Sequence, residues 1–347
     1  MQTVIPIQAL RALAALAVAA CHYDQVRLML SSRGAEVGPL FSLSAGVDVF
    51  FVISGFIMVF SSERLFAARG GSVEFLTRRL ARIVPLYWVT TGLAVWLMNR
   101  PIDWHSGLGS LLFIPHRDVS GAIVPLHGVG WTLNFEMFFY SLFAVAVVWR
   151  RTIAVPGLCV ALAAIVVAGS WLQPGFVPFS YWSDPIILEF AAGMLIALAY
   201  RNNARLPTVL RAVLIPAALF AMWSTPEHMP PSGYRFLVWG VPAAILVAAA
   251  ALGSRETPAR WIAAPVKLLG DASYALYLIH PLMGAVVLLG WPHGLNRYPI
   301  MAIVLTTAVI TQIIAIGVHV WLERPCTRAL VDFARRRPAR SAIEPAT

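Results

Sequence analysis

The segment IQALRALAALAVAACHY, residues 7–23, carries two polar side chains, Arg11 and His22, at the ends of an unbroken apolar run. Ala and Leu, both strong helix formers, dominate the ten residues between them, so the segment is predicted to form one helix. Eleven steps of about 100° return the second side chain to the face of the first, about 16 Å further along the axis. An arginine inside a membrane helix costs at least about 2.5 kcal/mol and usually faces a protein interior or a wet cavity. The alternative is an arginine that snorkels to the surface and a histidine at the membrane interface.

The composition of the chain is that of a polytopic membrane protein. Of its 347 residues, 59% are hydrophobic and only 12% are charged, and the mean hydropathy is +0.75. The net charge of +10 does not indicate a nucleic-acid partner, because most of the charges are loop arginines that flank apolar runs. The three cysteines form neither a disulfide framework nor a metal-binding spacing, so we expect no metal site.

Apolar runs of membrane-spanning length recur along the chain. They cover residues 5–22, 46–61, 83–98, 132–149, 153–171, 184–200, 209–224, 236–252, 272–290 and 299–321. We therefore expect an all-α polytopic helical bundle of about ten transmembrane helices, formed by residues 1–325 and followed by a short basic cytoplasmic tail, 326–347. The runs 46–61 and 83–98 are short, which predicts tilted, broken or extended helices, and the apolar piece 107–115 is expected to be re-entrant or interfacial.

Basic residues divide unevenly between the two sides that these spans define. The even-numbered connections and the tail hold 19 of the 26 Lys and Arg residues, the odd-numbered connections hold 6, and Arg11 lies inside a span. Because basic loops stay on the cytoplasmic side, both termini are predicted to be cytoplasmic. This orientation assigns a depth in the membrane to each polar residue in the spans.

Four polar residues are predicted to approach one layer at the outer side of the bundle. His22 lies at the outer end of the first span, Asp48 opens the second, and Glu136 and Glu189 lie near the outer ends of the fourth and sixth. A histidine beside a carboxylate is what a general base and its orienting partner require. The alternative for each carboxylate is an interfacial cap or one half of an internal ion pair.

The cytoplasmic side carries a cluster of arginines, Arg78, Arg79 and Arg82, just before the third predicted span. Positions 78 and 82 are one helical turn apart, and two guanidinium forks at this spacing can grip one phosphate. Positive-inside charge alone is the alternative explanation of the cluster. Tyr277 and His280 enter the ninth span from the same side, and His280 is predicted to lie near mid-membrane, a costly place for an unpaired polar group.

The arginine cluster and the outer layer together predict a basic site on the cytoplasmic side, a His–carboxylate site on the outer side, and Arg11 between them. This arrangement suits a molecule with phosphates at one end and a reactive group at the other. It equally suits a transporter or flippase for a glycan or an anionic metabolite, with an ion-coupled pathway. Transporters place their site at the midplane between inverted repeats, and no inverted repeat is evident in the sequence.

Several blocks in this order resemble the acyltransferase 3 family of bacterial membrane O-acyltransferases. The blocks are the Arg11–His22 spacing, GVDVFFVISGFI (46–57), RRLAR (78–82), GVGWTLNFEMFFY (128–140), LEFAAGM (188–194), SYALYLIHP (273–281) and ERP (323–325). They run from residue 6 to about 325, and the block 128–140 most resembles the exopolysaccharide-production branch. The resemblance implies a multi-pass protein of the bacterial inner membrane that transfers an acyl group to a hydroxyl of a surface or exported polysaccharide.

The resemblance also implies roles for individual residues. The donor is expected to be an acyl-CoA, usually acetyl-CoA, with no tightly bound cofactor, and its phosphates are expected at Arg78, Arg79 and Arg82, with Tyr277 and His280 nearby. His22 is the expected catalytic base, and Arg11 is its companion inside the bundle. The carboxylate that assists His22 is left open between Glu136, which we favour, and Asp48.

On the acceptor side, the resemblance implies a polysaccharide or a lipid-linked glycan. We expect Trp131 and Glu189 to contact it, although by pattern alone Trp131 fits the aromatic belt of the membrane interface better than a ligand contact. Arg11, Trp131 and a tyrosine are candidate donors to the oxyanion. Acceptor choice is expected to rest on the outer loops 23–45, 99–130 and 225–235 or on a separate glycan-assembly partner protein.

Overall fold

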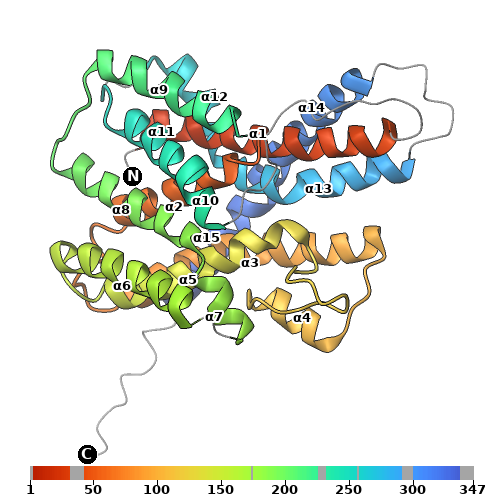
Figure 1. The fold of residues 1–347 in the computed structure, drawn as a ribbon, viewed down its shortest axis with the longest axis horizontal. Coiled ribbons are helices and arrows are strands. Elements are labelled where there is room, and N and C mark those ends of the chain that lie inside the picture. Colours follow the sequence, from red (N-terminus) through yellow and green to blue (C-terminus); the bar gives the residue numbers. More distant parts are fainter. Residues whose placement is uncertain are drawn as a thin grey trace, which may run out of the picture.

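The computed structural model describes residues 3–31, 43–172, 175–225, 232–255, 258–290 and 300–336, and these parts of the chain contain helices and no strand. The predicted all-α class is therefore confirmed (Figure 1). The α-helices are α1 (Ile5–Ser31), α2 (Gly46–Ser61), α3 (Gly71–Met98), α4 (Trp104–Leu111), α5 (Trp131–Ala146), α6 (Arg151–Leu172), α7 (Val177–Trp182), α8 (Leu188–Arg201), α9 (Thr208–Trp223), α10 (Ser232–Arg235), α11 (Val241–Ala251), α12 (Arg260–Asp271), α13 (Ser273–Gly290), α14 (Ile300–Val318) and α15 (Arg324–Arg336). Short 3₁₀ and π turns join some of them: η1 (Gly128–Gly130), η2 (Pro185–Ile187), η3 (Phe236–Gly240) and η5 (His319–Glu323).

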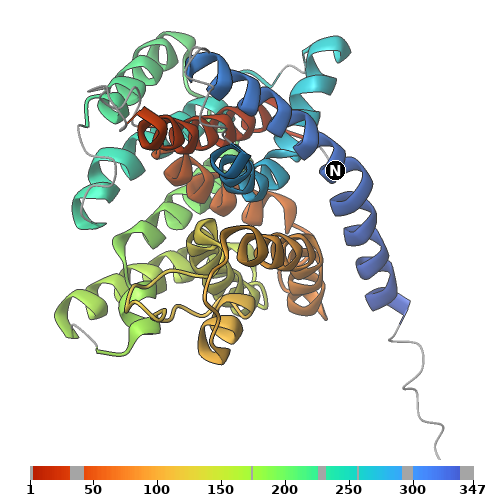
Figure 2. The same ribbon diagram turned by 90° about the vertical axis from the view of Figure 1, so that its right-hand side faces the viewer.

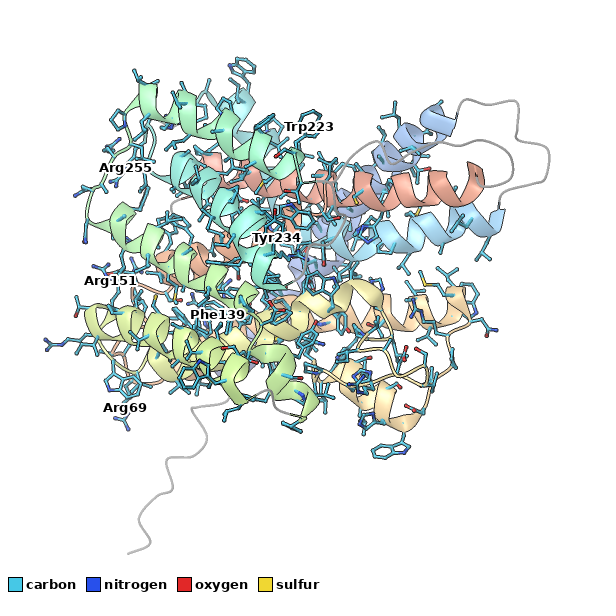
Figure 3. All side chains as sticks on the ribbon, in the orientation of Figure 1. Arg69, Phe139, Arg151, Trp223, Tyr234 and Arg255 are labelled. Carbon is cyan, nitrogen blue, oxygen red and sulfur yellow. The ribbon has the colours of Figure 1, made fainter. Side chains whose placement is uncertain are left out.

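Each of the ten predicted spans falls on a helix. Within the described residues, seven helical segments are long and apolar enough to cross a membrane, and α2 and α9 are shorter apolar helices. The chain is thus a multi-pass membrane protein, whereas the number of spans and the side of the termini stay predictions. Figure 3 shows Arg69, Arg151 and Arg255 at one end of the bundle, opposite the far ends of α1 and α13, as the uneven distribution of charge predicts.

Helix α3 begins twelve residues before the predicted start at residue 83. Its first turns contain Glu74 and three arginines, so the apolar-run criterion did not recognise them, although Glu74 and Arg78 form an ion pair one turn apart that supports a helix. The third predicted span is therefore an extended helix of 28 residues that contains the arginine cluster. The piece predicted at 107–115 forms the short helix α4, which Asp103 caps by accepting a hydrogen bond from the backbone N–H of Ser106 at 2.5 Å.

Helices α2 and α8 pack with their backbones in direct contact. A Cβ atom added to Gly55 of α2 would collide with the carbonyl oxygen of Phe190, and one added to Gly193 of α8 would collide with that of Val52. Membrane helices approach this closely where small residues face each other. Next to this contact, the rings of Phe139 and Phe190 stack with centroids 4.3 Å apart, which ties α5 to the pair.

The remaining helices surround the pair in two groups. Helices α1, α13 and α14 lie side by side on one side, and α3, α5 and α6 lie on the other (Figure 1). Figure 2 shows α14 and α15 as a long rod along the edge of the bundle, joined through η5, and α15 packs against α3. The predicted tail 326–347 thus begins inside a helix that contacts the bundle, and its residues 337–347 lie outside the described residues.

Candidate active site

A cavity of about 100 Å³ lies where α1, α2, α3, α5 and α13 meet. Its wall is apolar on the α2 side, and polar and charged side chains project into it from the other helices. Its polar and aromatic lining residues are Arg11, Phe50, Phe51, Ser54, Arg79, Arg82, Thr132, Glu136, Tyr140, Ser273, Tyr274 and Tyr277. Three guanidinium groups and one carboxylate therefore share one cavity.

Arg11 is buried, with 7% of its surface exposed. Its guanidinium donates to Gln8 Oε1 at 3.1 Å and to Ser273 Oγ at 3.0 Å, both neutral oxygens. Among the residues that the structure describes, no carboxylate lies within 4 Å of this guanidinium. Arg11 therefore faces the protein interior rather than snorkelling, and its positive charge is available to an anion in the cavity.

The three arginines of α3 have different surroundings. Arg79 donates to Ser61 Oγ at 2.6 Å, and its buried Nε has no hydrogen-bond partner within the described residues. Arg82 Nε lies 3.6 Å from Glu323 Oε1, and Arg78 pairs with Glu74 and does not line the cavity. The grip of residues 78 and 82 on one anion stays a prediction, whereas positions 79 and 82 are the ones that the helix turns toward this cavity.

Glu136 lies in this cavity and not beside His22, contrary to our expectation. Its Oε1 accepts hydrogen bonds from Ser54 Oγ at 3.1 Å and from the Tyr140 hydroxyl. The reason is the depth at which α5 begins. The Tyr277 hydroxyl donates to the backbone oxygen of Val129 at 3.1 Å, so α5 starts beside α13 and brings Glu136 to the level of the arginines.

Asp48 is half of an internal ion pair, the alternative that the sequence left open. Arg235 of α10 donates Nε to Asp48 Oδ1 at 3.0 Å and Nη2 to Oδ2 at 2.8 Å. The same guanidinium lies over the rings of Trp131 and Trp239, 5.3 Å and 5.0 Å from their centroids. Glu189 is fully buried nearby, next to Gly240 of η3. Asp48, Trp131 and Glu189 thus gather around Arg235.

His22 is oriented by a backbone carbonyl and by a second histidine. Its Nδ1 lies 3.0 Å from the Val18 oxygen, which can only accept a hydrogen bond, so Nδ1 carries the proton and Nε2 carries a lone pair. The ring of His280 lies edge-on to that of His22, with centroids 4.7 Å apart. No carboxylate within the described part of the chain contacts His22, and the expectation of a carboxylate partner is not met there.

His280 therefore belongs with His22, whereas we expected it on the donor side. Pro281 follows it in α13, and the side chain is fully buried between helices. Tyr277, one turn earlier, does line the cavity, and its hydroxyl lies 2.9 Å from Thr132 Oγ1.

Sequence reasoning missed four residues of the site. Tyr140 and Ser54 bind Glu136, Ser273 binds Arg11, and Glu323 lies beside Arg82. Tyr140 follows Glu136 by one helical turn within the same quoted block, so its spacing was a signal that could have found it. Glu323 belongs to the quoted block 323–325, but only the packing of α15 on α3 shows which arginine it approaches. In the described residues, no group of three His, Cys, Asp or Glu side chains is arranged to hold a metal.

Comparison with known proteins identifies the family. The acyltransferase domain of the acyltransferase 3 family matches residues 5–320, which include every helix that lines the cavity. The chain belongs to this family. This acyltransferase is 35% identical to the exopolysaccharide production protein ExoZ of Rhizobium meliloti (strain 1021) over 311 residues, which cover 86% of this chain and 95% of the relative. It is 29% identical to the acyltransferase MdmB of Streptomyces mycarofaciens over 377 residues, 97% of this chain and 94% of the relative.

No solved structure matches this acyltransferase. The resemblance that the sequence blocks carried is thus confirmed by the family match, and the chain is a multi-pass membrane enzyme of acyl transfer. The donor, the acceptor and the residues that act on them are matters for proposal.

Proposed function

We propose that this acyltransferase moves an acyl group, in the simplest case acetyl, from acyl-CoA to a hydroxyl of a surface or exported polysaccharide. The observation that carries the proposal is the cavity in which Arg11, Arg79 and Arg82 converge, with His22 about three helical turns beyond Arg11 on α1. Guanidinium groups bind phosphate oxygens through paired hydrogen bonds, and a general base accelerates acyl transfer to a hydroxyl.

Arg79 and Arg82 are the proposed phosphate-binding residues of the donor site. Guanidinium groups bind phosphate oxygens through paired hydrogen bonds, and Arg79 keeps a buried N–H that no described residue accepts. The aromatic rings of Tyr274 and Tyr277 line the same cavity and offer an apolar wall to the thioester arm. Arg11, which has only neutral partners, is the proposed donor that stabilises negative charge along this path.

His22 is the proposed general base. Its Nε2 accepts the proton of the acceptor hydroxyl while the hydroxyl oxygen attacks the thioester carbonyl carbon. The carbon–sulfur bond then breaks, and the departing CoA sulfur receives the proton from His22, so one ester and one free thiol are formed. The Val18 carbonyl holds the ring in the tautomer that this step requires.

The acceptor class rests on similarity. One relative is named for exopolysaccharide production, and we extend that class of acceptor to this chain. We assign the protein to the inner membrane, with the donor reaching the cavity from the cytoplasm and the acceptor approaching from the outer side. Trp131 and the loop that contains α4 are the proposed acceptor-side elements. A partner protein of glycan assembly is a further element of the proposal.

The test is binding and cleavage of acetyl-CoA by the purified protein in detergent, followed as CoA thiol release. Wild type is compared with His22→Ala and Arg82→Ala, and the controls are Arg69→Ala and Arg150→Ala, whose side chains are exposed and do not line the cavity. We expect Arg82→Ala to bind acetyl-CoA poorly, His22→Ala to bind it without releasing CoA, and both controls to behave as wild type. If wild type binds neither acetyl-CoA nor longer acyl-CoAs, the CoA donor is wrong and a transporter of glycans becomes the leading hypothesis.

A further inference from the structure

The surroundings of His22 lack the carboxylate that usually accompanies a catalytic histidine. Within the described residues, its polar contacts are the Val18 oxygen at Nδ1 and the ring of His280. When His22 accepts a proton at Nε2, its half-buried ring becomes a cation. Some neighbouring group has to stabilise that charge.

His280 is a fully buried imidazole with one unused nitrogen. Its Nδ1 lies 3.2 Å from the Leu276 oxygen, so Nδ1 carries the proton and Nε2 has a lone pair. No described residue donates to this Nε2, and its accessible surface is below 1 Å². A buried acceptor without a donor costs free energy and is uncommon in folded proteins, so it calls for a role.

The other polar groups around the pair are already engaged. The ring of Tyr277 is 5.8 Å from that of His280, but its hydroxyl bonds Val129 and Thr132. His127 lies 2.9 Å from the Leu278 oxygen through Nε2. His280 is therefore the described neighbour whose ring and lone pair remain available to His22.

We propose that His280 is a positioning residue for His22 and takes the place of the carboxylate in a histidine–carboxylate pair. The His280 imidazole packs at an angle against the ring of His22, and the lone pair on its Nε2, the negative end of the imidazole dipole, stabilises the imidazolium that forms when His22 takes the acceptor proton. The proton then leaves with the CoA sulfur, and both rings return to the neutral state. This inference rests on the proposed role of His22 as the base.

The substitutions that test the inference separate the effect of the His280 nitrogen from the effect of the size of the side chain. His280→Phe keeps an aromatic ring of similar size and removes the lone pair. His280→Gln places an amide oxygen near the position of Nε2, whereas His280→Asn is one carbon shorter and does not reach it. If His280 acts only by packing, the Phe variant keeps more activity than the Gln variant. If its nitrogen acts as proposed, the Gln variant keeps more activity.

We expect His280→Phe and His280→Asn to lower kcat for CoA release from acetyl-CoA by roughly tenfold, about the size of one polar contact to a charged group, with KM for acetyl-CoA unchanged. We expect His280→Gln to recover most of that loss. Thermal unfolding in the same detergent checks that each variant is folded, and Arg150→Gln, at an exposed position outside the site, is the control. A Phe variant as active as wild type, or a Gln variant no better than Asn, overturns the inference.

A second measurement does not depend on turnover or on the identity of the donor. Diethyl pyrocarbonate acylates neutral imidazole through a transition state that places positive charge on the ring, and mass spectrometry of the His22 peptide gives the rate. The inference requires slower labelling of His22 in the Phe and Asn variants than in wild type and Gln. Unchanged labelling in all variants contradicts it. If instead labelling follows the expected order while His22→Ala still transfers acyl groups, the role of His22 as base has failed and the contact itself stands.

Discussion

The carboxylate of Asp48 in α2 receives two parallel hydrogen bonds from the guanidinium of Arg235 in α10, at 3.0 Å and 2.8 Å. Both side chains are buried, with 0% and 6% of their surfaces exposed. Removing one partner of such a pair leaves a buried charge without compensation, which is far more costly than the pair is favourable. The pair therefore joins the start of α2 to the segment before α11.

Replacing Asp48 with Asn is expected to lower the free energy of unfolding by about 3–5 kcal/mol, because Arg235 stays buried and loses its counter-charge. The measurement is thermal unfolding of the purified protein in detergent. Asp118→Asn is the matched control, since Asp118 lies in an exposed loop and bonds only neighbouring residues. If the Asp48→Asn protein unfolds at the same temperature as wild type, the ion pair does not stabilise the fold as predicted.

A second prediction concerns the glycines between α2 and α8. Ala at Gly55 or Gly193 is expected to lower stability by about 1–3 kcal/mol, because the added methyl group forces the backbones apart. Gly157 in α6 is a helical glycine with nothing within 4 Å of an added Cβ. Gly157→Ala is therefore the control and is expected to be neutral or slightly stabilising, since Ala is the better helix former. Equal effects at all three positions would rule out the close packing.

A third prediction distinguishes the arginines of α3 by their direction. Arg79→Ala and Arg82→Ala are each expected to raise the Kd for acetyl-CoA by roughly 10- to 100-fold, the range for a charge-assisted hydrogen bond. Arg78→Ala is expected to leave it within about threefold, because a screened surface ion pair contributes little and Arg78 faces Glu74 outside the cavity lining. Calorimetry or filter binding with labelled acetyl-CoA gives the three constants. A rise in Kd for Arg78→Ala as large as that for Arg82→Ala supports the prediction that residues 78 and 82 bind one phosphate together.

A fourth prediction concerns Glu323, which joins Arg82 and His319. Its Oε1 lies 3.6 Å from Arg82 and its Oε2 lies 2.8 Å from His319 Nδ1. Glu323→Gln removes a negative charge from beside Arg82 and keeps the amide oxygen for His319. We expect the Kd for acetyl-CoA to fall by roughly two- to tenfold, because an anionic ligand then meets less repulsion. A higher Kd in this variant shows that the carboxylate holds Arg82 in place rather than competing with the ligand.

The sequence was sufficient for the helices and for the family, because both depend on local signals. Apolar runs of spanning length mark helices whatever their neighbours are, and each of the ten runs lies on one. The late predicted start of α3 has the same origin. Glu74 and the arginines lower the hydropathy of its first turns, so a criterion based on apolar runs does not detect them. For Arg11 the sequence left snorkelling open, and only its contacts with Gln8 and Ser273 place it in the interior.

The partners of the site residues depended on packing that no single-sequence pattern contains. Asp48, Glu136 and Glu189 were predicted to share a layer with His22, yet Asp48 pairs with Arg235, Glu189 lies next to Gly240, and Glu136 lies in the arginine cavity. Arg235 was counted as one of a few outer basic residues, and nothing local marks it as the partner of Asp48. The contact of His22 with His280 joins residues 258 positions apart in the chain, so it follows from the fold alone.

Helix α3 connects the two sides of the enzyme. It carries Arg79 and Arg82 into the cavity, and two turns later Trp88 donates its Nε1–H to the backbone oxygen of Leu111 at the end of α4, at 3.0 Å. Pro85 lies between the arginines and Trp88 in this helix. If occupation of the arginines shifts α3, the segment around α4 moves with it, and the two proposed substrates would then be thermodynamically linked, each changing the affinity for the other by the same factor.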